Sequence, residues 1–285
     1  PMILDAADAL VDEIQKSEIN ARLDIAIERK NAQNEFTMAQ SIAQDVVRLK
    51  YDYLVTLTTP VLQVCAQVNK TIPHIFGAVT DPYRMGVAKT PEDHIPNITG
   101  VATFQPVEST FVVMRELFPQ AKRVGIVWNP AEACSEACTQ KARIAAQELG
   151  FELLEVTVTS TTEVMDGVRN LAGKGIDLFL TSGDNTVNLA LASVAKYLQE
   201  HKIPYFTNTF SDVEQGAFVS VGADYTEVGR ETARMAIRVM GGEEPSQLPI
   251  NNYVPEKIYL NLALAKAYGL AIPESFIQKA AKVKE

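Results

Sequence analysis

Short apolar runs alternate along the chain with longer segments in which apolar residues recur at helical spacing. Most of the runs are apolar throughout, which is typical of strands in a parallel sheet that is covered on both faces. The predicted strands are Leu23–Glu28, Asp52–Leu57, His74–Ala78, Ile98–Thr103, Arg123–Trp128, Glu152–Val156, Leu178–Thr181, Tyr205–Thr207, Ala217–Val221 and Val254–Tyr259. The predicted helices include Phe36–Leu49, Pro60–Asn69, Val107–Phe118, Ala131–Leu149, Thr162–Ala172, Thr186–Glu200 and Glu227–Met240.

This alternation predicts a doubly wound α/β fold. Segments of the two halves also resemble one another in the same order and at a nearly constant offset: RLDIAIE and GFELLEV, DYLVTLTTP and DLFLTSGDN, KTIPHIF and HKIPYFT. We interpret the echo as two lobes of similar topology, although α/β units share stereotyped turn chemistry and the likeness can be generic. Two such sheets side by side form a cleft, and ligands bind outside the carboxyl ends of the strands.

Composition excludes some classes of protein. The 285 residues carry a formal net charge of −9, which argues against nucleic acid as a partner because phosphate binding needs a basic face. The cysteines, Cys65, Cys134 and Cys138, are odd in number, so a complete disulfide framework is excluded, and we expect Cys134 and Cys138 to be reduced and metal-free. The sequence carries no leader or lipid-attachment cysteine, and we expect that a leader was removed or that native residues precede Pro1.

Residues that cap helices follow four of the predicted strands. Thr59 before Pro60, Asn129 before Pro130, and the polar run 182–186, with Asn185 or Thr186 as the cap, are suited to open helices, and Thr80 with Asp81 follows another strand. Helix N-termini that converge on a cleft would receive a carboxylate, while Asp81 or Asp184 would meet an ammonium group. Each of these residues also has a purely structural interpretation as a cap, but the set of four favours a ligand site.

Two aromatic residues at strand ends, Trp128 and Phe210, are the best candidates for an apolar wall of that site. The sequence has no phosphate-binding loop, nucleophile elbow or zinc-protease motif, so we expect a binding protein and not an enzyme. An enzyme that uses Asp81 or Asp184 as an acid or base is the alternative, and no cofactor or metal is expected.

Several motifs resemble one known family. They are LDAADALVDEI, TLTTPVLQVCAQVNKTIPHIFGAVTDP, NITGV, AKRVGIVWNPAEA, SGDNTV and GADYTEVGRETARMAIRVMGGEEP. In order and spacing they resemble the substrate-binding proteins of ABC transporters, of the tryptophan/tyrosine-binding (TrpX-like) type. The resemblance covers essentially the whole chain.

The resemblance implies a type I periplasmic-binding fold with two doubly wound parallel-sheet lobes joined by a three-strand hinge. Residues 1–103 and 224–248 would form lobe one, and residues 104–223 and 249–285 would form lobe two. Two departures are noted: the family begins with a central strand that is absent here, and Cys134 stands where the family often has Asn. The ligand contacts implied by the family motifs are Thr58, Thr59, Thr80, Asp81, Asn129, Ser135, Asp184, Asn185, Thr186 and Asp224.

The implied function is that of a solute-binding protein of an ABC importer, which closes like a Venus flytrap on an aromatic or apolar amino acid between its lobes and docks on a membrane permease. We expect a monomer that is periplasmic, or extracellular and membrane-anchored. A ligand-sensing domain of a signalling or regulatory system is the alternative, because one fold serves many functions.

Overall fold

The computed structural model describes residues 2–33 and 35–285, and the chain divides into two compact lobes. Lobe one comprises Pro1–Phe104 and Asp224–Pro255, and lobe two comprises Gln105–Ala223 and Glu256–Glu285. The chain therefore passes three times from one lobe to the other. The sequence-based division assigns Phe104 and residues 249–255 to lobe two, whereas the structure has them in lobe one. Residues 249–255 belong to lobe one because β9 (Asn251–Asn252) pairs with a strand of its sheet.

The sheet of lobe one has four parallel strands in the order β1-β2-β3-β9. Its strands are β1 (Leu54–Leu57), β2 (His74–Val79) and β3 (Ile98–Ala102), followed by the short β9. Every residue of β2 and β3 is buried, which is the pattern that uniformly apolar runs predict for inner parallel strands.

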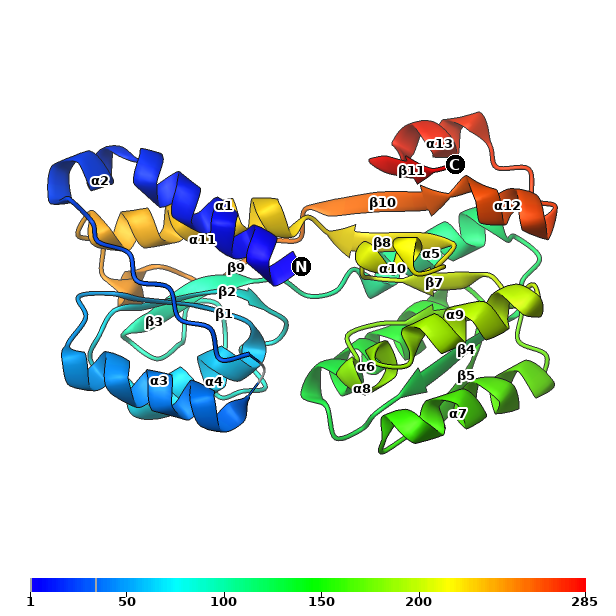
Figure 1. Cartoon of the computed structure of the whole chain (residues 1–285), viewed down its shortest axis with the longest axis horizontal. Helices are drawn as coiled ribbons and strands as arrows, with labels where there is room; N and C mark the ends of the chain where they lie inside the picture. The colour runs from blue at the N-terminus through cyan, green and yellow to red at the C-terminus, as the bar shows by residue number, and fades with distance from the viewer. Residues whose placement is uncertain (1, 34) are drawn as a thin grey trace. The chain divides into compact units, whose positions relative to one another are not determined.

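The helices of lobe one include a packed pair formed by the two segments of chain that build this lobe. Figure 1 shows α1 beside α11, and the close approach depends on Gly229, where an added Cβ would lie 2.1 Å from the carbonyl oxygen of Ala6. Leu10 and Ile14 of α1 join the apolar cluster beneath this contact. The helices are α1 (Met2–Lys16), α2 (Glu18–Leu23), α3 (Phe36–Leu49), α4 (Thr59–Val68), α11 (Tyr225–Met240) and the 3₁₀ turn η1 (Pro245–Gln247).

The predicted strand Leu23–Glu28 is wrong. Leu23 ends α2, Asp24 takes a left-handed conformation with φ 52°, and the following residues form no regular structure. No strand of the described residues pairs with this segment, so its backbone has no ladder to join. Ile25 and Ile27 instead pack as half-buried side chains against the cluster that contains Leu10.

The sheet of lobe two has seven strands in the order β11-β10-β8-β7-β6-β4-β5. All neighbours are parallel except β8 and β10, which run antiparallel. Its strands are β4 (Arg123–Trp128), β5 (Glu152–Thr157), β6 (Leu178–Thr181), β7 (Tyr205–Thr207), β8 (Val219–Ala223), β10 (Glu256–Asn261) and β11 (Lys282–Lys284). In two of the three sequence echoes both segments form strands: β1 and β6 in one echo, and β2 and β7 in the other.

One predicted helix of lobe two, Thr186–Glu200, is two helices in the structure. The break follows from tight i to i+3 bonds, in which Ala190 N–H donates to Val187 and Ser193 N–H donates to Ala190. The helices of this lobe are α5 (Val107–Leu117), α6 (Ala133–Glu148), α7 (Thr161–Gly173), α8 (Asn185–Asn188), α9 (Leu191–Glu200), α10 (Ser211–Glu214), α12 (Leu262–Tyr268) and α13 (Glu274–Lys279).

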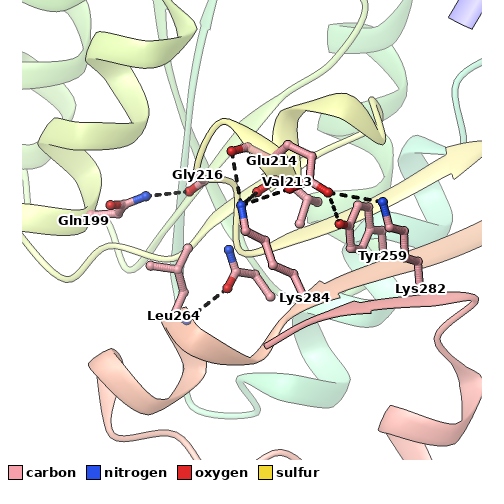
Figure 2. A network of polar contacts seen from close by, with 9 residues as sticks. Gln199, Val213, Glu214, Gly216, Tyr259, Leu264, Lys282 and Lys284 are labelled. Atoms are coloured by element: carbon pink, nitrogen blue, oxygen red, sulfur yellow. Dashed lines mark hydrogen bonds and ion pairs between the residues drawn. The ribbon is translucent and has the colours of Figure 1, made fainter.

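The end of the chain joins lobe two through the pairing of β11 with β10 and through contacts with one carboxylate. Figure 2 shows Glu214 of α10 accepting a hydrogen bond from the Tyr259 hydroxyl of β10. The same carboxylate pairs with Lys282 and Lys284 of β11, each at 3.1 Å. These contacts lower the pKa of Glu214 to about 2, with the Tyr259 hydrogen bond as the largest cause.

Candidate functional site

The strand order of lobe two reverses at β4, which lies between β5 and β6. The connections on the two sides of β4 therefore diverge at its carboxyl end, and this switch point is where open α/β sheets bind ligands. Asn129 follows β4 directly, and Asp184 follows β6. The local sequence thus brings the residues predicted at two separate strand ends to one edge of the lobe-two sheet.

Asp184 joins the loops that follow β4 and β6. Its Oδ2 accepts hydrogen bonds from Asn129 N–H at 2.6 Å and from the Ser135 hydroxyl at 2.5 Å. Its Oδ1 accepts from Val187 N–H at 2.8 Å and caps α8, a role for which the sequence had offered Asn185 or Thr186. The side chain is 2% exposed, and burial raises its pKa against the opposing effect of these three donors. Asp184 therefore positions the two loops, a structural task that its sequence context does not reveal.

Glu132 is the site residue that sequence analysis missed. Its carboxylate accepts four hydrogen bonds from two consecutive residues: the N–H and side-chain amide of Asn185, each at 2.9 Å, and the N–H and hydroxyl of Thr186, at 2.9 and 2.6 Å. These four hydrogen bonds hold the first residues of α8 against Glu132, the residue that precedes α6. An acidic residue in the first turn of the predicted helix Ala131–Leu149 was the available signal, because a carboxylate is favourable near a helix N-terminus.

Asn129 does not cap α6 as predicted, because the helix begins later and Glu132 takes the N-cap position. The Asn129 side chain instead accepts from Ala131 N–H at 2.9 Å and donates to the Thr186 hydroxyl, also at 2.9 Å. Asn129, Ser135, Asp184, Asn185 and Thr186 are therefore assembled into one polar cluster, which Glu132 completes. Burial in this cluster is uneven, since Asn129 is buried and Asn185 is exposed.

The two predicted aromatic residues both lie in lobe two, and each is already engaged by its neighbours. Trp128 is 7% exposed, its indole N–H donates to Glu155 at 3.0 Å, and the Arg143 guanidinium lies 5.4 Å from its ring. Phe210 is half-buried and packs edge to face with Tyr259, with ring centroids 6.5 Å apart. Both residues shape the carboxyl edge of the sheet.

A second polar cluster forms at the carboxyl ends of β1 and β2 in lobe one. Thr58, and not Thr59, occupies the N-cap position of α4, and the Thr59 hydroxyl accepts from Thr80 N–H at 3.3 Å. Thr58 has φ 82° and ψ 150°, a region that is occupied almost only by glycine. Ala78, near the end of β2, also has a positive φ, 54°. Backbone strain of this kind concentrates at functional sites.

Two carboxylates in lobe one organise backbone turns. Asp81 Oδ1 accepts from Tyr83 N–H at 3.0 Å and from Arg84 N–H at 3.1 Å, while Oδ2 lies 3.7 Å from Arg84 Nε. Asp81 is half-buried. Asp224 is the N-cap of α11 and accepts from Thr226 N–H at 3.0 Å. Within the described residues, no group of three or more His, Cys, Asp or Glu side chains could hold a metal ion.

Comparison with known proteins agrees with this architecture. The family model of ABC transporter substrate-binding proteins matches residues 1–284. The chain belongs to this family. It is a solute-binding protein of the extracytoplasmic type, and no helix among the described residues has the length and apolar character needed to cross a membrane.

Three proteins are similar to this chain over most of its length. A tyrosine-binding protein of Clostridioides difficile (strain R20291) is 30% identical over 262 residues, which cover 92% of this chain and 74% of the relative. The ligand-free, open structure of a substrate-binding protein with adhesive properties from Clostridium difficile is 30% identical, with a TM-score of 0.81 and coverage of 98% and 95%. An ABC domain from Streptococcus pneumonia in complex with L-Trp shares the fold at 24% identity, with a TM-score of 0.86 and coverage of 99% and 95%.

Proposed function

We propose that this substrate-binding protein carries an aromatic amino acid, with tyrosine as the first candidate, and delivers it as a monomer to a membrane permease. The main support is the tyrosine-binding relative, which matches 92% of the chain at 30% identity. The polar clusters at the strand ends of each lobe add independent support, because they lie where α/β sheets bind ligands.

Different residues are suited to bind the ammonium group and the carboxylate of an amino-acid ligand. Asp184 has both oxygens occupied by protein donors, so it is poorly placed to hold an ammonium group. Asp81 is half-buried, and its Oδ2 has only the long contact with Arg84 among the polar contacts described above. We assign the ammonium to Asp81, and the ligand carboxylate to the first amides of α4 together with Thr58.

Titration calorimetry of ligand-stripped protein with Tyr, Trp, Phe and Leu tests the function. We expect tyrosine to bind with the highest affinity. If none of the four binds more tightly than about 100 μM, which corresponds to about 5.5 kcal/mol, the amino-acid assignment fails.

The role of Asp81 is tested by Asp81→Asn, which keeps the oxygen that accepts from Tyr83 and Arg84 but removes the charge. We expect tyrosine to bind at least tenfold more weakly, because a hydrogen bond to a charged group contributes about 1.5–3 kcal/mol. A tyrosine analogue without the amino group should lose no affinity. Asp93→Asn, at an exposed acid of the same lobe, is the matched control. Equal losses for tyrosine and the analogue would contradict the assignment.

The role of Asp184 is tested by Asp184→Ala, which leaves three donors without their acceptor. We expect a loss of about 2–4 kcal/mol in the free energy of unfolding of lobe two. Ser135→Ala removes one of the three bonds and should cost about 1 kcal/mol. Urea unfolding followed by the fluorescence of Trp128, the single tryptophan of the chain, measures both variants. Unchanged stability of Asp184→Ala would refute the positioning role.

A further inference from the structure

Two thiols lie one helical turn apart at the start of α6. Cys138 is fully buried and Cys134 is half-buried, and neither takes part in a disulfide. A side-chain hydrogen bond joins Cys138 to Cys134. The first turn of α6 thus presents a pair of sulfur atoms in mutual contact, with one of them accessible from outside.

The thiol pair supports the loop that carries Asp184. Gly183 has φ +62°, and a Cβ added there would lie 2.6 Å from Cys134 Sγ and 2.9 Å from Cys138 Sγ. The loop residue must therefore be glycine for its conformation and also for the space that the sulfur atoms occupy. Ser135, adjacent to Cys134, donates to Asp184 at 2.5 Å. A movement of the first turn of α6 would therefore displace Asp184 through the packing of the sulfur atoms against Gly183 and through the Ser135 hydrogen bond.

The helix geometry nearly fits a disulfide. Residues four apart in an α-helix have Cα atoms about 6 Å apart, within the range of disulfides, but their Cβ atoms are about 1–2 Å further apart than a disulfide allows. Closure therefore requires the first turn to tighten. Cys134 is the second residue of α6, and the first N–H groups of a helix take no part in its internal hydrogen bonds, so this turn deforms at low cost.

We propose that Cys134 and Cys138 form an oxidative modification site that closes to an intrahelical disulfide when it meets a low-molecular-weight disulfide. The Cys134 thiolate attacks one sulfur of the reagent and expels the other as a thiolate, which takes up the Cys134 proton. The Cys138 sulfur then attacks Cys134 Sγ in the mixed disulfide and expels the second reagent thiol. In total, two protein thiols are oxidised, and one external disulfide is reduced to two thiols.

The surroundings set the order and the rate of these steps. Cys134 reacts first because Cys138 is buried. The hydrogen bond with Cys134, and secondly burial, raise the pKa of Cys138 well above that of an ordinary thiol, so ring closure is slow at neutral pH and accelerates as pH rises. An extracytoplasmic protein works in an oxidising environment where such closure persists, so the proposed disulfide departs from the sequence-based expectation of reduced thiols.

Closure has a consequence for the ligand, and this part rests on the proposed function. Tightening the first turn of α6 displaces Ser135 from Asp184 and disturbs the two loops that Asp184 joins. We expect the oxidised protein to bind tyrosine at least fivefold more weakly than the reduced protein, with affinity restored by dithiothreitol.

The test uses the full chain, oxidised glutathione and intact mass spectrometry after acid quench. We expect the wild type to lose the mass of two hydrogens without an adduct. Cys138→Ala should retain one glutathionyl group, because nothing resolves the mixed disulfide. Cys65→Ala, at a buried thiol of lobe one, should close like the wild type. The inference is overturned if the wild type keeps the adduct or stays unmodified, or if peptide mapping places Cys65 in the disulfide.

Calorimetry separates this inference from the proposed function. If the reduced protein binds no aromatic amino acid, the proposed function fails while the mass result still decides the modification site. If closure occurs and tyrosine affinity is unchanged, the coupling between the thiol pair and the ligand is refuted.

Discussion

His74 offers a direct test of how this fold responds to acid. The ring is completely buried at the start of β2, with Nε2 2.8 Å from the Thr56 hydroxyl of β1. Its Nδ1 has no hydrogen-bond partner among the described residues, and no carboxylate is paired with the ring in the described contacts. Burial lowers the pKa of His74 to about 3, so the folded protein requires the neutral ring.

The size of the effect follows from the two pKa values. An unfolded histidine has a pKa of about 6.5, so the stability contributed by neutral His74 is complete above that pH and is lost as pH falls toward 3. Linkage gives a loss of about 2 kcal/mol between pH 8 and pH 5, and about 4 kcal/mol at pH 3. A loss of this size is a large fraction of the usual stability of a domain.

The perturbation is His74→Gln, whose amide reaches the position of Nε2 and can pair with Thr56 but cannot become charged. We expect the variant to be less stable at pH 8 by about 1–2 kcal/mol, because the smaller side chain leaves space in the core. Relative to the wild type it should then gain about 2 kcal/mol at pH 5.

Urea unfolding followed by circular dichroism at both pH values provides the measurement. The quantity to compare is the difference between variant and wild type, because Asp212 titrates in the opposite direction in lobe two. His201→Gln, at an exposed histidine after α9, should keep the acid response of the wild type. A destabilisation by His74→Gln that is equal at pH 8 and pH 5 would refute the reasoning.

Three further predictions concern charge and backbone strain. Burial raises the pKa of Asp212 to about 6, so the folded protein loses stability as pH rises through that value. Asp212→Asn should therefore be more stable than the wild type by about 1–3 kcal/mol at pH 8 but not below pH 4, and thermal melts at both pH values measure the difference. Thr58→Gly should relieve about 1–2 kcal/mol of strain while weakening tyrosine binding; an unchanged melting temperature would contradict this. Gly183→Ala should cost more stability than Gly86→Ala, since both have positive φ but only Gly183 faces sulfur atoms, and equal melting temperatures would argue against that packing.

Hydrophobic patterning predicted most of the paired strands, but it missed the short strands β9 and β11 at the edges of the two sheets. The runs 123–128 and 178–181 form strands with the predicted bounds, and every residue of these strands except Arg123 is buried. The run 23–28, which also contains Asp24 and Glu28, forms no strand, because strand formation depends on a neighbour that supplies hydrogen bonds and a local pattern cannot reveal that neighbour. Strands β8 and β10 begin two residues later than predicted, since their pairing with each other fixes the register.

The sequence placed the candidate residues at strand ends, where the structure gathers them into a polar cluster in each lobe, but it did not predict the hydrogen bonds within these clusters. Capping chemistry at strand ends selected Thr59, Asn129 and the polar run 182–186, but in the structure Thr58 and Glu132 hold the N-cap positions of α4 and α6. The donors that bond to each carboxylate come from separate loops. The three hydrogen bonds to Asp184 and the four to Glu132 therefore could not be predicted from local sequence. The aromatic residues show the same limit, since Trp128 is engaged by Arg143 from another element.

The packing of α1 against α11 has a consequence for folding during translation. About 200 residues separate these helices, and at roughly 5–20 residues per second the ribosome needs roughly 10–40 s to make the second after the first. Throughout that interval Leu10 and Ile14 lack the surface that buries them in the finished protein. Residues 105–223 of lobe two, by contrast, emerge as one uninterrupted segment. The nascent chain should therefore organise its middle first, and its N-terminal helix should remain a target for chaperones until α11 arrives.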